Sequence, residues 1–177
     1  MTSINDLPAG TWTVDPAHSE LGFTARHLMV SKVRGKFADF TGTVEVADPV
    51  SGSKVTAAAK LASVDTGSAD RDGHLKSPDF FDVENNEEMT FVSTSVSDDE
   101  LVGDLTIKGI THPVTFDLEF NGVQTDPWGN TKAGFEATAD INRKDWGLNW
   151  NAALEGGGVL VSEKIKITLD IQLLKTA

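Results

Sequence analysis

The sequence predicts an all-β fold, either an antiparallel barrel or a sandwich, with one short helix near residues 68–78. After Gly10, apolar and polar residues alternate with a period of two through most of the chain, which is typical of strands that bury one face. Turn-forming pairs such as Asp48-Pro49 and Asn121-Gly122 separate these runs at short intervals. Regular strands with such frequent turns are typical of barrels and sandwiches.

The alternating runs give the expected strands in chain order. A tight connection through Asp15 and Pro16, which favour turns, separates the first two runs. The clearest run ends the chain, where aliphatic residues from Ile165 to Leu173 alternate with polar ones. The expected strands cover residues 11–14, 21–27, 40–46, 55–61, 88–97, 101–107, 114–120, 135–141 and 165–173.

Residues 68–78 interrupt the alternation. Ser68 is suited to cap the N-terminus of a helix, and Pro78 is suited to end it. Acidic residues concentrate around this helix, because residues 65–104 contain twelve acidic side chains and only two basic ones. We interpret this stretch as a solvated acidic rim.

Length and composition limit the class of protein. The 177 residues suit one domain, expected at 10–177 after a flexible leader at 1–9. The absence of cysteine excludes disulfides, thiolate zinc sites and cysteine catalysis. A net charge of -12 argues against nucleic acids and anionic membrane surfaces, which attract basic residues. No secretory signal and no apolar run of about 18 residues is visible, so we expect a cytoplasmic protein without stable membrane insertion.

The sequence offers little catalytic chemistry. Its four histidines fall in none of the spacings typical of metal sites. No hydrolase elbow, phosphate-binding loop or dinucleotide fingerprint is present. We therefore expect no catalytic residues, no metal and no cofactor.

The interior of such a barrel leaves two alternatives open. About eight strands enclose a space just wide enough for side chains or for one small ligand. Large Phe residues and small residues share the expected inward positions, so the side chains either interlock into a solid core or leave an apolar tunnel. A tunnel would hold a long hydrocarbon chain, because burial gains about 25 cal/mol per Å² of apolar area. The alternation parity places the following residues on its lining: Phe23, Phe40, Phe91, Phe116, Phe135, Ala137 and Ile167.

A second group of residues is polar and suited to the mouth of a tunnel. Its members are His18, His27, Arg71, Asp72, His74 and Arg143. Structural roles would explain several of them: Arg71 and Asp72 can form a local ion pair, His27 can be a hydrogen-bonded rim residue, and Arg143 can end a strand. The functional alternative is that the cations meet an anionic head group, because the guanidinium fork suits phosphate.

Five ordered motifs run through the chain. The most distinctive is SVDTGSADRDGHLKSPDFFD at 63–82. Before it stand WTVDPAHSELGFTARHL at 12–28 and GKFADFTGTVEVADP at 35–49, and after it LVGDLTIKGITHPV at 101–114 and an N-R-x-D-W-G element at 142–147. From residue 10 to about residue 174 the chain resembles the YceI-like polyisoprenoid-binding family. It departs from the family pattern at Glu88, where a proline often precedes the strand.

The resemblance implies an extended lipocalin-like barrel of eight antiparallel strands with a helix near one end. It also implies non-enzymatic binding, carriage or storage of a long isoprenoid lipid, either a polyprenyl diphosphate or an isoprenoid quinone, in an apolar tunnel. Relatives are often homodimers, which leaves a homodimer open for this chain. Two other functions also stay open: an enzyme that acts on a prenyl diphosphate in the same pocket, with His27 or His74 as its acid or base, and a stress-protective module without lipid.

Overall fold

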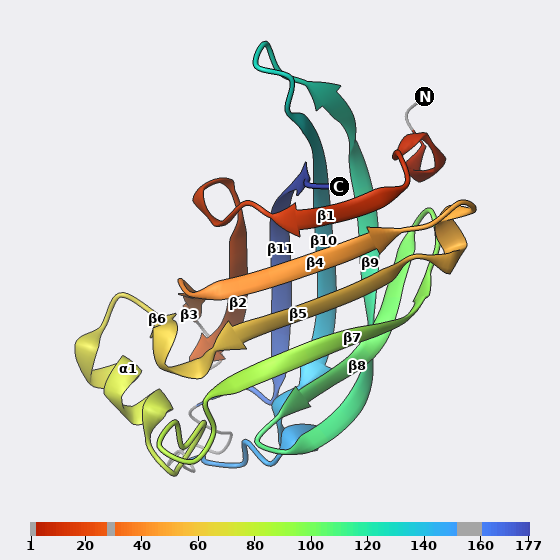
Figure 1. The fold of residues 1–177 in the computed structure, drawn as a ribbon. Helices are drawn as coiled ribbons and strands as arrows, with labels where there is room; N and C mark the ends of the chain where they lie inside the picture. The colour runs from red at the N-terminus through yellow and green to blue at the C-terminus, as the bar shows by residue number, and fades with distance from the viewer. Residues whose placement is uncertain (1–2, 28–30, 152–160) are drawn as a thin grey trace.

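Eight antiparallel strands close into a barrel in the computed structural model, which describes residues 3–27, 31–151 and 161–177 (Figure 1). The strands are β1 (Gly10–Val14), β4 (Phe40–Val46), β5 (Lys54–Lys60), β7 (Glu88–Val96), β8 (Glu100–Ile107), β9 (Ile110–Thr125), β10 (Thr131–Asn142) and β11 (Lys164–Lys175). They pair in the order β1-β4-β5-β7-β8-β9-β10-β11, and a pairing of β1 with β11 closes the ring. This arrangement confirms the predicted eight-stranded antiparallel barrel.

Three further strands extend the sheet from the edge of β11: β2 (Glu20–His27), β3 (Ser31–Phe37) and β6 (Val64–Asp65). The same edge of β11 serves two partners, because residues 173–175 pair with β1 and residues 166–170 pair with β2. Strand β3 then pairs with β2, and β6 pairs with the end of β3. Strands β2 and β3 therefore form an extension of the sheet beside the closed ring.

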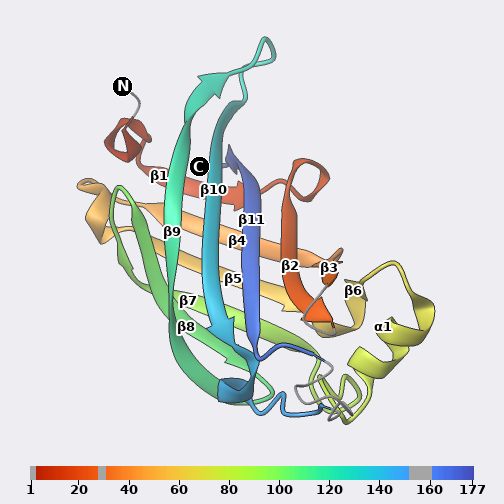
Figure 2. The same ribbon diagram turned by 180° about the vertical axis from the view of Figure 1, so that it is seen from behind.

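One α-helix lies at the end of the barrel next to β6, as both views show (Figures 1 and 2). This helix, α1 (Ala69–Lys76), begins where the Ser68 side chain accepts a hydrogen bond from the Arg71 backbone N–H, and it ends at Ser77. The helix predicted near residues 68–78 is confirmed. None of the helices in the described ranges is long and apolar enough to cross a membrane.

The described part of the expected leader, residues 3–9, lies against the barrel. A short 3-10 helix, η1 (Ile4–Asp6), buries Ile4, and Leu7 is buried as well. The Trp12 indole N–H donates to the Pro8 carbonyl oxygen at 3.0 Å, which holds this segment to β1. Ile4 and Leu7 thus belong to the hydrophobic core of the barrel.

An irregularity in β7 determines which side chains face the interior. Met89 and Phe91 share one parity, and Val96 has the other. The register between β7 and β8 shifts between Ser93 and Ser95, which indicates a β-bulge. The extra residue reverses the parity, so Val96 is buried like Phe91.

Candidate functional site

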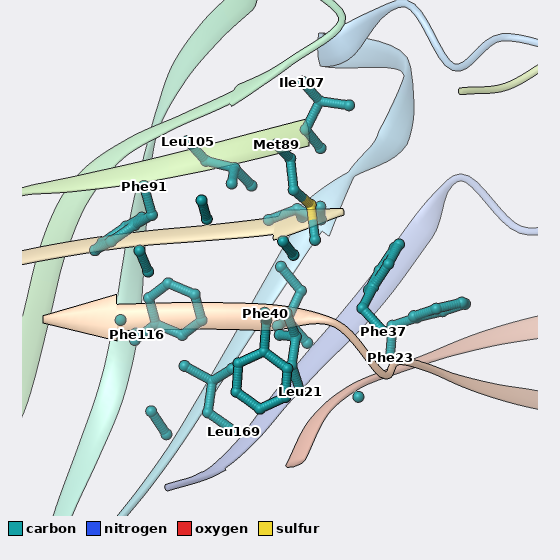
Figure 3. Close-up of a pocket in the computed structure, with 18 of the residues that line it drawn as sticks. Leu21, Phe23, Phe37, Phe40, Met89, Phe91, Leu105, Ile107, Phe116 and Leu169 are labelled. Atoms are coloured by element: carbon teal, nitrogen blue, oxygen red, sulfur yellow. The ribbon is translucent and has the colours of Figure 1, made fainter. Parts of the chain in front are cut away.

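The barrel encloses a cavity of about 670 Å³ lined mainly by aliphatic and aromatic side chains (Figure 3). Figure 3 shows side chains from different strands, among them Phe40, Phe116 and Leu169, that point toward the same space. The volume lies within the range of roughly 300–1,000 Å³ typical of small-molecule sites. Of the two alternatives that the sequence left open, the structure therefore has the open interior.

All seven residues that the alternation parity placed on the lining do line this cavity. They come from six strands: Phe23 on β2, Phe40 on β4, Phe91 on β7, Phe116 on β9, Phe135 and Ala137 on β10, and Ile167 on β11. Four inward residues of β11 are only half-buried although they line the cavity, namely Ile165, Ile167, Leu169 and Ile171, whereas Leu173 is buried. Since the space in front of them is open, the cavity accounts for this exposure. Contact of these residues with a lipid stays a prediction.

Several lining residues were not predicted from the sequence. Phe37 ends β3, a strand absent from the expected set, and it contacts both Phe23 and Phe81, with ring centroids 5.6 and 5.8 Å apart. Phe80 and Trp150 also line the cavity, and their ring centroids lie 5.5 Å apart. The alternation of Val33, Gly35 and Phe37 with lysines and arginine was the signal that could have revealed β3.

Polar side chains gather at one end of the cavity. The charged and imidazole residues of the lining are all here: Arg26 from the end of β2, Asp70, Arg71 and His74 from α1, and Arg143 from the 3-10 helix η5 (Arg143–Trp146), with Thr66 and Ser68 beside α1. Arg26, Asp70 and Arg71 are also exposed on the surface. The opening of the cavity therefore lies between the end of β2 and α1, and we call this region the polar end.

Arg143 is the buried cation of the polar end, with only 3% of its surface exposed. Its Nε donates to the Ser162 carbonyl at 2.9 Å, its Nη1 to the carbonyls of Leu148 and Trp150, and its Nη2 to the Val161 carbonyl at 3.3 Å. Burial lowers the pKa of the guanidinium, and the charge of Glu163 opposes this shift. Arginine nevertheless stays protonated in proteins, so the polar end retains a fixed positive charge. Arg143 does more than end a strand, because it joins residues 148–150 to residues 161–162.

His74 lies between an acidic partner and two aromatic rings. Its Nε2 is 2.9 Å from Asp79 Oδ2. The imidazole meets the Trp150 ring edge-on at a centroid distance of 4.5 Å and the Phe80 ring at 5.2 Å. These contacts fix the orientation of the imidazole at the cavity wall.

Arg71 and Asp72 bind the same residue and do not pair with each other. Asp72 Oδ1 accepts hydrogen bonds from the Thr66 backbone N–H at 2.9 Å and from its hydroxyl at 2.6 Å. Arg71 donates from Nε to Thr66 Oγ1 at 2.8 Å and from Nη2 to the Thr66 carbonyl at 2.9 Å. The local ion pair considered from the sequence is thus wrong, and both side chains brace the start of α1. Arg71 lines the cavity, whereas Asp72 does not.

Of the two other polar candidates, one lies away from the polar end and the side chain of the other lies outside the described residues. His18 is exposed in the 3-10 helix η2 (Pro16–His18), where its Nδ1 lies 2.8 Å from Asp15 Oδ2, and it does not line the cavity. The sequence offered it as a mouth residue because it is a polar side chain within the motif at 12–28. His27 ends β2 opposite Ser31, and its side chain lies outside the described part of the structure. Within the described ranges, no group of three or more His, Asp or Glu residues is arranged to hold a metal ion.

Comparisons with known proteins place this barrel in a family. The family model of the YceI-like domain matches residues 12–173. The chain belongs to the YceI-like family. A UPF0312 protein of Staphylococcus epidermidis strain RP62A is 45% identical to it over 154 residues, which cover 86% of this chain and 90% of the relative. A UPF0312 protein of Staphylococcus aureus strain MSSA476 is 48% identical over 157 residues, 88% of this chain and 92% of the relative.

Solved structures share the same YceI-like architecture. BcnA of Burkholderia cenocepacia has a TM-score of 0.77 at 19% identity, covering 90% of this chain and 98% of its own. The YCEI protein of Campylobacter jejuni has a TM-score of 0.72 at 27% identity, covering 86% and 90%. A polyisoprenoid-binding domain from Saccharophagus degradans, implicated in plant cell wall breakdown, has a TM-score of 0.67 at 16% identity, covering 94% and 98%. The two structures below 25% identity show that the fold is shared.

Proposed function

We propose that this YceI-like protein binds a long isoprenoid lipid in its cavity and carries or stores it without a chemical step. The observation that carries the proposal is the form of the cavity: about 670 Å³ of apolar space inside a closed barrel, with polar side chains gathered at one end. A molecule with a long hydrocarbon tail and a polar head matches this division. The Saccharophagus degradans domain, described as polyisoprenoid-binding, shares the fold and so adds support.

The apolar wall is suited to an isoprenoid tail. Leu21, Leu169, Met89 and the Phe side chains present apolar surface without hydrogen-bond donors. Each Å² of apolar ligand area removed from water contributes about 25 cal/mol, and no hydrogen bonds are needed along the tail. Selection among tails would therefore depend on length and shape.

The polar end is suited to a head group that carries negative charge or electron-rich oxygens. Arg143 uses four of its five N–H donors on backbone carbonyls. Among the described residues, no carboxylate lies within ion-pair distance of it. Its charge therefore attracts a ligand oxygen electrostatically. The guanidinium of Arg71 and the imidazole of His74, each held in place by its own hydrogen bonds, line the same end of the cavity. A diphosphate and a quinone carbonyl both fit this chemistry.

The direct test is to extract the purified protein with organic solvent and to analyse the extract by mass spectrometry. We expect one isoprenoid lipid in near-stoichiometric amount, and delipidated protein should take up an isoprenoid quinone or a polyprenyl diphosphate. Protein that contains no lipid and takes up neither compound would contradict the proposal. That result would favour the stress-protective module without lipid.

A second candidate function, an enzyme that acts on a prenyl diphosphate, rests on His74. This imidazole lines the cavity and is oriented by Asp79, as a general acid or base requires. Turnover of a prenyl diphosphate that disappears in His74→Ala, with lipid binding retained, would favour the enzyme over the carrier.

A further inference from the structure

The outer face of the β2–β3 hairpin carries a cluster of cations. Arg26 on β2 and Lys32, Arg34 and Lys36 on β3 are all exposed. Residues 21–38 contain these four cations and no acidic residue, in a chain with 27 acidic side chains. We call these four residues the basic hairpin face.

The strand register places the cations next to one another. Lys32 lies directly opposite Arg26, and Arg34 lies opposite Thr24. Thr24 in turn lies opposite the exposed Lys166 of β11, which itself lies opposite the exposed Asp140 of β10, so the positive surface ends at this point of the barrel wall. Like charges that face each other across two strands destabilise a sheet. Stability alone therefore does not account for this arrangement.

The basic hairpin face also has few acidic partners. None of its four side chains makes an ion pair within 4.0 Å with another described residue. The carboxylate nearest in register is Asp65 of β6, which lies opposite Lys36 at the edge of the sheet. The face consequently presents a local excess of positive charge to the solvent.

This face borders the opening of the cavity. Arg26 belongs to the face and also lines the polar end, and Val33, between Lys32 and Arg34, lines the cavity from within. Both views show β2 and β3 beside β6 and α1 (Figures 1 and 2). A surface bound to the basic hairpin face would therefore lie next to the point where a ligand enters.

We propose that the basic hairpin face docks the protein on a bilayer surface that contains anionic lipids, so that the cavity opens beside the bilayer. This inference rests on the proposed function, since an isoprenoid chain resides in a membrane and has to leave it to enter the barrel. The net charge of -12 is no obstacle, because the field of an anionic surface decays over about 8 Å at physiological ionic strength. Exposed carboxylates also border the face, among them Asp65 opposite Lys36 and Asp70 of α1, so the docking contact has to come from the four clustered cations.

Co-sedimentation with vesicles tests the proposal. We expect binding to vesicles of phosphatidylcholine mixed with phosphatidylglycerol, weak binding to phosphatidylcholine alone, and release at high salt. One cation near an anionic surface changes the partition coefficient about fivefold. The triple variant Lys32→Gln, Arg34→Gln, Lys36→Gln should therefore bind about 100-fold more weakly, and Arg34→Gln alone about fivefold more weakly.

A matched control removes three cations elsewhere. The control is the triple variant Lys54→Gln, Lys108→Gln, Lys132→Gln, whose substitutions lie on β5, on the β8–β9 turn and on β10. It changes the net charge by the same amount and should bind vesicles like the parent protein. Equal weakening in both triple variants would overturn the proposal. So would a salt-sensitive dimer, formed without vesicles and lost in the hairpin variant, because the face would then bind a second copy of this chain.

The vesicles contain no isoprenoid, so the result is independent of lipid uptake. Protein that yields an isoprenoid on extraction but ignores anionic vesicles overturns the docking surface and leaves the proposed function standing. Protein that docks through the basic hairpin face but takes up no isoprenoid retains the surface and overturns the carrier function.

Discussion

The ring of Phe91 on β7 occupies the space that a side chain at Gly103 on β8 would need. A Cβ atom at Gly103 would lie 2.8 Å from Phe91 Cε1 and 2.6 Å from the Val92 carbonyl oxygen. Gly42 receives Val14 in the same way, with Val14 Cγ2 only 2.7 Å from the position of a Cβ. The space beside some small inward residues is thus filled by neighbouring side chains of the barrel wall, while the centre of the barrel stays open.

This contact predicts that Gly103→Ala destabilises the barrel. The new methyl group meets backbone as well as the Phe91 ring, so the neighbours have little room to move. Overpacking of this kind costs about 1–3 kcal/mol of unfolding free energy, which lowers the Tm of a domain this size by roughly 2–10 °C. Thermal unfolding followed by circular dichroism measures the change.

Gly73→Ala in α1 is the matched control. A Cβ at Gly73 meets no atom within 4 Å, and alanine favours an exposed helix by about 0.5–1 kcal/mol over glycine. We expect a small rise in Tm for this variant. A drop equal to that of Gly103→Ala would show that the effect is not due to the Phe91 contact.

The barrel was predictable because period-two alternation records which face of each strand is buried. Strand β3 was not predicted, although Val33, Gly35 and Phe37 alternate with cations. Gly35 in the middle of the run lacks the apolar side chain that the pattern requires. The structure supplies it from β2, because the Phe23 ring fills the space above Gly35, with Cε1 2.8 Å from the position of a Cβ.

The candidate site was predictable only where it lies on regular strands. Parity was sufficient to find Phe135 and Ala137, because β10 alternates without interruption along the inward face. Trp150 lies in an irregular segment, where no period applies. The role of Arg143 depends on carbonyl groups up to 19 residues away, and such contacts follow from the path of the chain in space, which local sequence does not specify.

Ala137→Phe should close the cavity and leave the fold intact. Ala137 is buried and lines the cavity between Leu118 on β9 and Leu169 on β11. A benzyl group has to extend into the open space, so uptake of an isoprenoid quinone should fall at least tenfold. Fluorescence titration with the quinone measures uptake, and far-ultraviolet circular dichroism monitors the fold.

Glu136→Phe adds the same ring on the other face of β10, where residue 136 is exposed. Since this ring points away from the cavity, uptake should stay at the level of the parent protein. Unchanged affinity in Ala137→Phe would show that the ligand does not occupy this part of the barrel.

Arg143→Met should destabilise the protein mainly because buried carbonyl groups lose their hydrogen-bond donor. The substitution leaves the carbonyls of Leu148, Trp150 and Ser162 without their donor, and an unsatisfied buried polar group costs about 1–3 kcal/mol. We expect a fall in Tm of roughly 10 °C. Lys144→Met, at the exposed neighbouring position, should change the Tm by less than a quarter of that. A normal Tm with weakened lipid uptake in Arg143→Met would instead assign the guanidinium a purely head-group role.

Asp15 should make the stability of the barrel depend on acid pH. The hydrogen bond from the His18 side chain lowers the pKa of the Asp15 carboxyl, burial opposes this shift, and the Ala17 backbone N–H adds to it. A carboxyl with a lowered pKa in the folded state stabilises the protein above its unfolded pKa of about 3.9, and this contribution is lost as the pH falls through the folded value.

The test compares the Tm of the parent protein and Asp15→Asn from pH 6 downward. The asparagine side chain can still cap η2 but carries no charge. The Tm of the parent should therefore exceed that of Asp15→Asn by a constant amount down to about pH 5, and this difference should disappear below about pH 4. His18→Ala removes the main cause of the shift and should reproduce the effect of Asp15→Asn. A difference in Tm that stays constant into the acid range would mean that the Asp15–His18 contact does not stabilise the carboxylate. Asp15 would then act only as a structural link, through the 3.3 Å hydrogen bond that Gln172 of β11 donates to it.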